Sequence, residues 1–316
     1  MVENQHIKIN PIISTLNLTK KYNQIPVVNN LNLNIHKSCF ALLGPNGAGK
    51  TTTLLMLLNL IKPTEGKAFI FGKNTTENSV EIRKKIGYLP ENIGFYPNMS
   101  GRKHLELFYR LRTNSNDVKE STNSLLKWCG LKNNYWDKRI KTYSQGMRQR
   151  LGLAIAFAGN PEIVFLDEPL SNIDPIGRVE LIDKIKEKER EGITIIISSH
   201  IILEVERIAD SIAIIFNGNL KISSNIINLS QNFGFNEYEI IHNKNLNNSQ
   251  ETLEAVYDDL LNNQELFVKN PTLLSDKIII KTEEPFEIKK NLRKFNQIEL
   301  RPISGTLDKI YRKLVG

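Results

Sequence analysis

The sequence predicts an α/β fold built on a mainly parallel sheet. Three continuous apolar runs are typical of parallel strands buried on both faces, at residues 39–44, 163–169 and 193–200. Helical patterns at residues 51–61 and 177–192 separate these runs, and connections of this length join parallel strands. The first run leads directly into the glycine-rich bend GPNGAGKT.

The chain is expected to form a first domain at residues 1–227 and a small α+β domain at residues 228–316. In the first, apolar residues at helical spacing predict an inserted helical subdomain at about residues 92–160. In the second, the asparagine-rich residues 225–250 indicate a connection with some strand. The sequence then predicts a strand at 277–281 and helices at 251–263 and 305–315. Dimer support is the first role expected for this small domain, with a regulatory ligand or surface padding as alternatives.

Composition is that of a soluble globular protein and argues against a disordered chain or a coiled coil. The 316 residues are 40% hydrophobic and 24% charged. The net charge of +8 suits nucleic acid, an acidic membrane face and nucleotide phosphates alike. Cys39 and Cys129 lie outside any CxxC or Cys/His cluster and are expected as core residues in a reducing compartment. A signal-peptide pattern and a run of about 18 apolar residues are both missing, which predicts a cytoplasmic protein.

The bend matches the phosphate-binding motif G-x-x-x-x-G-K-[ST]. Its glycines allow successive N–H groups to converge, and the N-terminus of the following helix adds partial positive charge. We expect Lys50 to reach the β- and γ-phosphates, Thr51 to ligate Mg²⁺ and Thr52 to hold an α-phosphate oxygen. A turn that only joins strand to helix is the alternative. The expected ATP-binding residues here are Gly44, Pro45, Asn46, Gly47, Ala48, Gly49, Lys50, Thr51 and Thr52.

Two acids end the second apolar run. In IVFLDEP, a buried strand carries Asp167 and Glu168 to its carboxyl end, where α/β sheets bind ligands. Asp167 would hold the Mg²⁺ shell through water, and Glu168 would polarise the attacking water as a general base. An acidic pair in a solvated loop is the alternative, and the order of the pair after the phosphate loop favours catalysis.

The segment YSQGMRQR at residues 143–150 resembles the signature of ABC-type ATPases, the nucleotide-binding subunits of ABC transporters. Ser144, Gln145 and Gly146 match its Ser-Gly-Gly core with one change, Gln145 for glycine. In the family this segment crosses a dimer interface and contacts the γ-phosphate bound by the other subunit. The resemblance therefore implies ATP binding by these three residues, with Ser144 and Gly146 at the interface. The alternative is an ordinary helix cap at Ser144.

Further segments match the family in its order. Tyr22 lies where the family stacks an aromatic ring on adenine, and LSNIDP resembles the D-loop, with Asp174 near the dimer interface. His200 in IIISSH resembles the switch histidine, which hydrogen-bonds the γ-phosphate and orients the attacking water. The implied catalytic residues are thus Lys50, Glu168 and His200. A half-buried strand tyrosine and a structural histidine are the alternatives for Tyr22 and His200.

One segment departs from the family pattern. GYLPEN aligns with the Q-loop, but Glu91 stands where many members carry glutamine. A carboxylate can ligate Mg²⁺ or its water but lacks the amide donor, so Glu91 is expected near the metal with its coupling role open. A branch of single-domain export-type ATPases with a C-terminal extension shares this glutamate. The chain resembles that branch densely over about residues 14–220 and weakly to its end.

The resemblance implies a P-loop NTPase core of the ABC type, with an antiparallel β subdomain beside the mainly parallel sheet and the helical subdomain. It implies a Mg²⁺-dependent ATP hydrolase that forms a homodimer or heterodimer on ATP. This motor subunit would drive a separate transmembrane permease, for export, from the inner face of the membrane. Adenine is expected rather than guanine, because no NKxD motif is present.

A soluble ABC ATPase acting on ribosomes or DNA is the second interpretation, which the basic charge supports. Translation-type members usually carry two ATPase domains in one chain, and repair-type members contain long coiled coil. This sequence has one set of motifs and no sustained heptads, so no nucleic-acid partner is expected. A nucleotide sensor without turnover conflicts with the presence of both Glu168 and His200. The transported substrate is not encoded here, because specificity lies in the permease.

Overall fold

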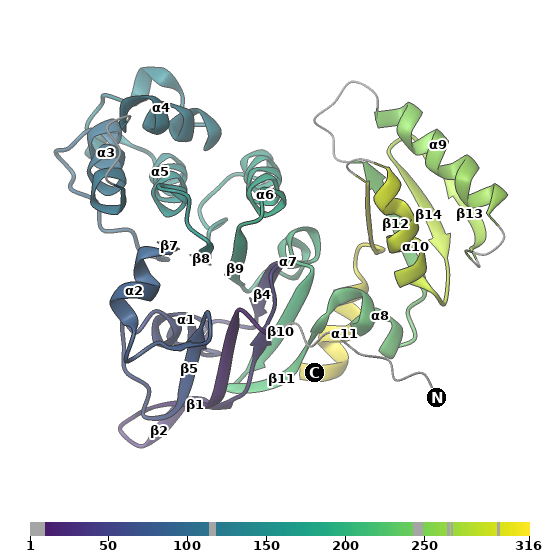
Figure 1. Ribbon diagram of the computed structural model, residues 1–316, viewed down its shortest axis with the longest axis horizontal. Helices are drawn as coiled ribbons and strands as arrows, with labels where there is room; N and C mark the ends of the chain where they lie inside the picture. Colours follow the sequence, from purple (N-terminus) through teal and green to yellow (C-terminus); the bar gives the residue numbers. More distant parts are fainter. Residues whose placement is uncertain (1–9, 114–117, 243–248, 264–265, 267, 296–297) are drawn as a thin grey trace. The chain divides into compact units, whose positions relative to one another are not determined.

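The structure, a computed structural model, describes the chain except for residues 1–9, 114–117, 243–248, 264–265, 267 and 296–297. It divides into two compact units, Met1–Ser223 and Ser224–Gly316. The first unit contains two sheets and the second contains one, each with helices, and most of these elements are labelled in Figure 1.

A six-stranded sheet forms the centre of the first unit. Its strands, in sheet order, are β11 (Asn219–Asn225), β10 (Ser211–Phe216), β4 (Cys39–Leu43), β9 (Thr194–Ser199), β8 (Ile163–Asp167) and β7 (Ile86–Leu89). The pairs β10–β4, β4–β9, β9–β8 and β8–β7 are all parallel. Every residue of β4, β8 and β9 is buried, as their continuous apolar runs predict. The mainly parallel sheet is therefore confirmed.

Helices follow the strands that carry the motifs. They are α1 (Lys50–Leu57) after β4, α6 (Pro175–Arg190) after β8 and α7 (Ile202–Ile208) after β9. The prediction that the first helix extends to residue 61 is wrong. Asn59 adopts a φ of 50°, and the amides of Leu60 and Ile61 both bond to the carbonyl of Leu55, so the chain leaves the helix in a tight turn.

An antiparallel sheet also belongs to the first unit. It contains β1 (Ile13–Tyr22), β2 (Ile25–Leu31), β3 (Asn34–Ile35), β5 (Glu65–Ile70) and β6 (Lys73–Asn74). Asn23 and Gln24 join β1 to β2 with φ values of 48° and 68°, the left-handed backbone that a two-residue hairpin turn needs. The expected antiparallel β subdomain is confirmed.

The helical insertion contains α3 (Gly101–Arg112), α4 (Val118–Trp128) and α5 (Gln145–Phe157), with short turns η1 (Asn133–Tyr135) and η2 (Ile140–Thr142). α2 (Ser79–Lys84) precedes β7. The helices share an apolar core that includes Leu105, Leu126 and Leu151. Cys129 lies in this core and Cys39 begins β4, and both side chains are buried, as expected.

The second unit is a four-stranded antiparallel sheet with accompanying helices. The strands, in sheet order, are β13 (Lys269–Leu273), β14 (Lys277–Lys281), β12 (Glu237–His242) and β15 (Ile298–Pro302). The helices are α8 (Ile226–Asn232), α9 (Ser249–Asn262), α10 (Pro285–Asn291), η4 (Leu292–Lys294) and α11 (Thr306–Val315). The expected strand at 277–281 and the two expected helices are present.

Helix α8 corrects the interpretation of residues 225–250 as a connection with some strand. Asn225 caps the helix, because its side chain accepts a hydrogen bond from the Ile227 amide at 2.9 Å. Ile227 and Leu229 are buried in the unit and stabilise the helix by packing. Residues 243–248 of the same stretch lie outside the described residues.

Candidate nucleotide-binding and catalytic site

The glycine-rich bend connects β4 to α1 and is held close to neighbouring backbone. A Cβ at Gly44 would lie 2.2 Å from the Ile215 carbonyl oxygen, so only glycine fits there. Gly47 and Gly49 have φ values of 78° and 99°, which favour glycine as well. Gly49 is the N-cap of α1, so the bend delivers its backbone amides to the positive end of that helix.

Lys50 is buried at the base of this bend, with only 6% of its surface exposed. Its Nζ donates hydrogen bonds to the carbonyl oxygens of Gly44 at 2.7 Å and Pro45 at 3.1 Å. The same nitrogen lies 3.5 Å from Glu168 Oε1. The ammonium group therefore bridges the phosphate-binding loop and the acidic pair.

Asp167 ends β8 beside the first turn of α1. Its Oδ1 accepts hydrogen bonds from Thr51 Oγ1 at 3.1 Å and from the Ser198 hydroxyl. Its Oδ2 is buried and accepts no hydrogen bond from any residue that the structure describes. Burial raises the pKa of Asp167, against the lowering effect of the two hydroxyl donors.

This arrangement fits a Mg²⁺ ion. The Thr51 hydroxyl and the unpartnered Asp167 oxygen are hard oxygen ligands on adjacent elements. No cluster of three or more His, Cys, Asp or Glu side chains suited to a metal occurs among the described residues. A metal at this place would thus take most of its ligands from water and phosphate, as Mg²⁺ commonly does.

Glu168 follows directly and has an unusual backbone. Its φ is 48°, a left-handed conformation that is strained for a residue with a side chain. The Glu168 amide donates to Ser198 Oγ at 3.0 Å. On the side chain, Oε2 lies 3.0 Å from His200 Nδ1. The strained backbone thereby aims the carboxylate between Lys50 and His200.

A cavity of about 320 Å³ lies between the phosphate-binding loop and Glu168, and neither Asp167 nor His200 lines it. Glu91, which comes just after β7, reaches the same cavity as the phosphate-binding loop and Glu168. Burial and then the negative charges of Asp167 and Glu91 raise the pKa of Tyr88 on β7. The cavity is lined by Val27, Asn46, Gly47, Gly49, Lys50, Thr51, Thr52, Glu91 and Glu168.

Other residues expected in the site do not line this cavity. Tyr22 ends β1 with 49% of its surface exposed, and Lys20 Nζ lies 5.1 Å from its ring centroid. Ser144 is the N-cap of α5 and accepts from the Met147 amide at 3.2 Å, with Gln145 and Gly146 in the first turn. Asp174 caps α6 in the same way, accepting from the Gly177 amide at 2.9 Å.

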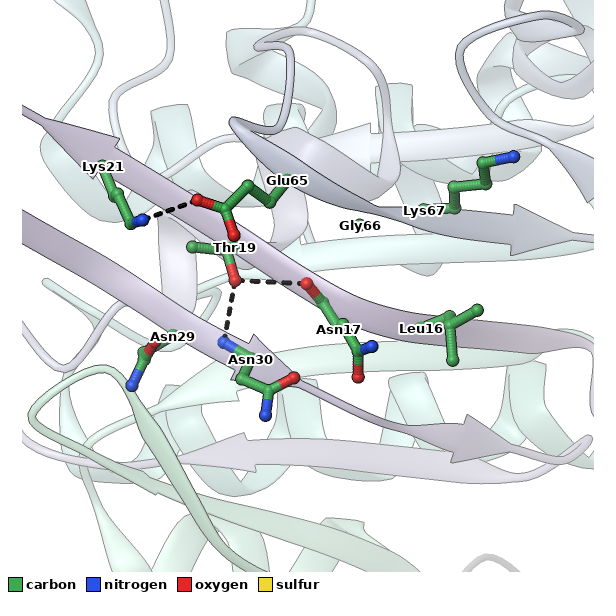
Figure 2. Close-up of a pocket in the computed structure, with 9 residues that line it drawn as sticks. All are labelled: Leu16, Asn17, Thr19, Lys21, Asn29, Asn30, Glu65, Gly66 and Lys67. Atoms are coloured by element: carbon green, nitrogen blue, oxygen red, sulfur yellow. Dashed lines mark hydrogen bonds and ion pairs between the residues drawn. The ribbon is translucent and has the colours of Figure 1, made fainter.

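A second cavity, of about 500 Å³, lies on the antiparallel sheet (Figure 2). Its clearest polar contacts are the Lys21–Glu65 ion pair at 2.6 Å and a Thr19 hydroxyl that bonds to the backbone of Asn17 and Asn30. No residue predicted for catalysis or ATP binding lines it. The cavity at the phosphate-binding loop is therefore the candidate site.

Two buried residues of this site were missed by sequence reasoning. Ser198 contacts both acids, through Asp167 Oδ1 and the Glu168 amide. Gln149 on α5 donates to the carbonyl oxygens of Glu168 and Pro169. The signal that could have pointed to them is their closeness in sequence to predicted site residues. Ser198 precedes His200 by two residues, and Gln149 follows Ser144 by five.

Comparisons with known proteins agree with this geometry. The family model for ABC transporters matches residues 28–171. The bacitracin transport ATP-binding protein BcrA of Enterococcus faecalis is 40% identical over 238 residues, which cover 74% of this chain and 76% of that protein. The chain is an ABC transporter ATP-binding subunit. The ABC subunits of this family hydrolyse ATP, so the chain is an ABC-type ATPase.

Further relatives extend the comparison. The lantibiotic transport ATP-binding protein SrtF of Streptococcus pyogenes is 41% identical and covers 65% of this chain and 86% of its own length. The dimeric ABC transporter cassette MJ0796 superposes with a TM-score of 0.64 at 26% identity, over 67% of this chain and 98% of the cassette. Its dimer bound to ADP and Pi superposes equally well, at 25% identity. The P-loop ABC fold is thereby confirmed.

Among the residues that the structure describes, no helix has the length and apolar character needed to cross a bilayer.

The burial of Asp167 predicts that its charged carboxylate lowers the free energy of unfolding of this ABC subunit. Because burial raises the pKa of Asp167, the ionised carboxylate destabilises the folded state. This penalty is absent below the unfolded-state pKa, grows as the pH rises and is complete above the folded-state pKa. Asp167→Asn should therefore raise the thermal unfolding midpoint at neutral pH, by an amount that shrinks on acidification in calorimetry. The control is Asp137→Asn, because Asp137 is exposed and Arg102 lowers the pKa of its carboxyl, so this change should not raise the midpoint. An unfolding midpoint of Asp167→Asn at or below that of the wild type would contradict the argument.

Proposed function

We propose that the cavity at the phosphate-binding loop binds ATP as substrate and that Glu168 is the general base of its hydrolysis. The observation that carries this proposal is the position of the Glu168 carboxylate, 3.0 Å from His200 Nδ1 and 3.5 Å from Lys50 Nζ. A carboxylate at this edge of the sheet, facing the phosphate-binding loop, is suited to orient and polarise the attacking water.

The chain's own residues divide the work of hydrolysis. The amides of the bend and Lys50 hold the phosphates. When ATP binds, Lys50 Nζ gives up its hydrogen bonds to the carbonyl oxygens of Gly44 and Pro45 and donates to phosphate oxygens instead. Thr52 holds an α-phosphate oxygen, and Tyr22 stacks on the adenine. His200 hydrogen-bonds the γ-phosphate and keeps the Glu168 carboxylate in place through the contact at Oε2.

Thr51 and Asp167 would hold a Mg²⁺ ion, Asp167 through water, with Glu91 close by. When bound, the ion would neutralise charge on the β- and γ-phosphates. Glu91 adds negative charge where the family often has a neutral glutamine, which favours a cation at the cavity.

Two ATPase subunits pair around ATP in this proposal. Ser144 and Gly146, with Gln145 between them, lie outside the chain's own cavity at the N-terminus of α5. Since helix N-termini bind anions, these residues are suited to contact the γ-phosphate held by a second subunit, with Asp174 at the same interface. The MJ0796 cassettes, which are dimeric, support this assembly. Residues 1–227 would form the ATPase domain, and residues 228–316 an accessory domain that supports the dimer.

The dimer is proposed to act on a transmembrane permease at the inner face of the membrane. We infer export of antimicrobial peptides as the transported class, because BcrA and SrtF are named for bacitracin and lantibiotic transport. The alternative, a soluble ABC ATPase acting on ribosomes or nucleic acid, is not favoured by these relatives. Co-purification separates the two, since the proposal requires the chain to copurify with a permease in detergent and not with ribosomes.

Glu168→Gln is expected to lose most of its turnover while retaining ATP. The amide cannot take a proton from water, so hydrolysis should fall by about 10²-fold or more. ATP should then remain bound and hold two chains together in the presence of Mg²⁺, observed as a dimer by sedimentation. Glu162→Gln is the matched control, because Glu162 is an exposed residue paired with Lys85 just before β8. Wild-type turnover in Glu168→Gln would show that Glu168 is not the general base. If this variant stays monomeric in the presence of ATP and Mg²⁺, ATP sites shared between two chains are ruled out.

A deletion strain tests the substrate class. Loss of the chain should raise sensitivity to bacitracin or to a lantibiotic, measured as the minimal inhibitory concentration. The wild-type chain and Glu162→Gln should restore resistance, whereas Glu168→Gln should not. Unchanged sensitivity to both peptide classes would exclude this substrate class while leaving the ATPase assignment intact.

A further inference from the structure

Gln149 is a buried polar residue in the middle of α5. Only 3% of its surface is exposed. Its side-chain Nε2 donates to the Pro169 carbonyl oxygen at 2.9 Å and, more weakly, to the Glu168 carbonyl oxygen at 3.4 Å. These hydrogen bonds hold the buried side-chain amide in place, because a buried donor without an acceptor costs free energy.

The two acceptors belong to the strained turn that aims the catalytic base. Glu168 has a φ of 48°, and its amide is held on the other side by the Ser198 hydroxyl at 3.0 Å. Gln149 and Ser198 therefore hydrogen-bond the two peptide groups that flank the Glu168 Cα. A strained conformation persists only when its surroundings fix it in this way.

Gln149 also shares a helix with the residues proposed to contact the second ATP. α5 begins directly after Ser144 and runs without interruption through Gln149 to Phe157. A helix of this length moves as a rigid element, so a displacement of Ser144 is carried to Gln149. A short physical path thus leads from the Ser144 end of α5 to the backbone of Glu168.

We propose that Gln149 is a positioning residue that couples the two ATP sites of the dimer. It rests on the proposed function, in which Ser144 contacts the ATP of the partner subunit while Glu168 acts on the chain's own ATP. When Ser144 contacts the ATP of the partner subunit, it fixes the position of α5. The hydrogen bonds of Gln149 then place the carbonyl groups of the Glu168–Pro169 turn so that the Glu168 carboxylate is positioned for hydrolysis. Hydrolysis in one site therefore depends on the presence of nucleotide in the other.

The test replaces Gln149 by methionine, which keeps the length and removes both donors. We expect turnover at saturating ATP to fall by about tenfold, since small displacements of a catalytic group are costly. The affinity for Mg·ATP should stay within about twofold, and Glu168→Gln/Gln149→Met should still dimerise with ATP. Gln231→Met is the matched control, because Gln231 likewise donates to a backbone carbonyl, that of Glu283 at 2.8 Å, in the second unit.

Gln149→Glu provides a second variant if the methionine variant folds poorly. Its carboxyl can donate only when protonated, and burial raises the pKa of such a group. The ratio of its turnover to that of the wild type should therefore rise as the pH falls from about 8 to about 6.

Two results would overturn the inference. One is wild-type turnover in Gln149→Met, and the other is a parallel loss of ATP affinity and turnover, which indicates a merely structural role. Failure of Glu168→Gln alone to dimerise with ATP would instead overturn the proposed function. The two failures are thereby distinguishable.

Discussion

The left-handed backbone at Glu168 is the constraint on which the site depends. β8 ends in Asp167, whose side chain accepts a hydrogen bond from Thr51, and the next residue, Glu168, must turn its own carboxylate toward the cavity that Thr51 lines. An extended strand would send adjacent side chains to opposite faces, so a regular backbone cannot do this. The φ of 48° solves the problem, and the contacts with Ser198 and Gln149 hold it. Strain and buried charge are thus concentrated at the proposed catalytic site, as expected for a site that is organised before its substrate binds.

The two sheets and the helical insertion serve this arrangement in different ways. The parallel sheet brings the ends of β4, β8 and β9 to one edge, which places Lys50 and His200 within reach of the Glu168 carboxylate. α5, which belongs to the helical insertion, sends Gln149 into that edge and keeps Ser144 at its far end. The same helix therefore contacts the Glu168–Pro169 turn and carries the surface proposed to meet a second subunit.

Much of this was predictable because the signals are local. Continuous apolar runs predict the buried strands, and the phosphate-binding motif predicts the bend with its left-handed glycines. The rest depends on contacts between distant residues. Gln149 meets the Glu168 turn only after folding, and nothing in its neighbours distinguishes it from an exposed helical glutamine. α8 was missed because asparagine is common in connections, whereas its stability comes from burying Ile227 and Leu229.

Glu168→Asp tests the central claim most directly. This change keeps a carboxylate of similar basicity and withdraws it by one methylene from the position that the strained backbone sets. If position is decisive, turnover should fall on the order of 10²-fold while the affinity for Mg·ATP stays close to that of the wild type. Turnover close to that of the wild type would contradict the account, because it would show that any carboxylate on this turn suffices.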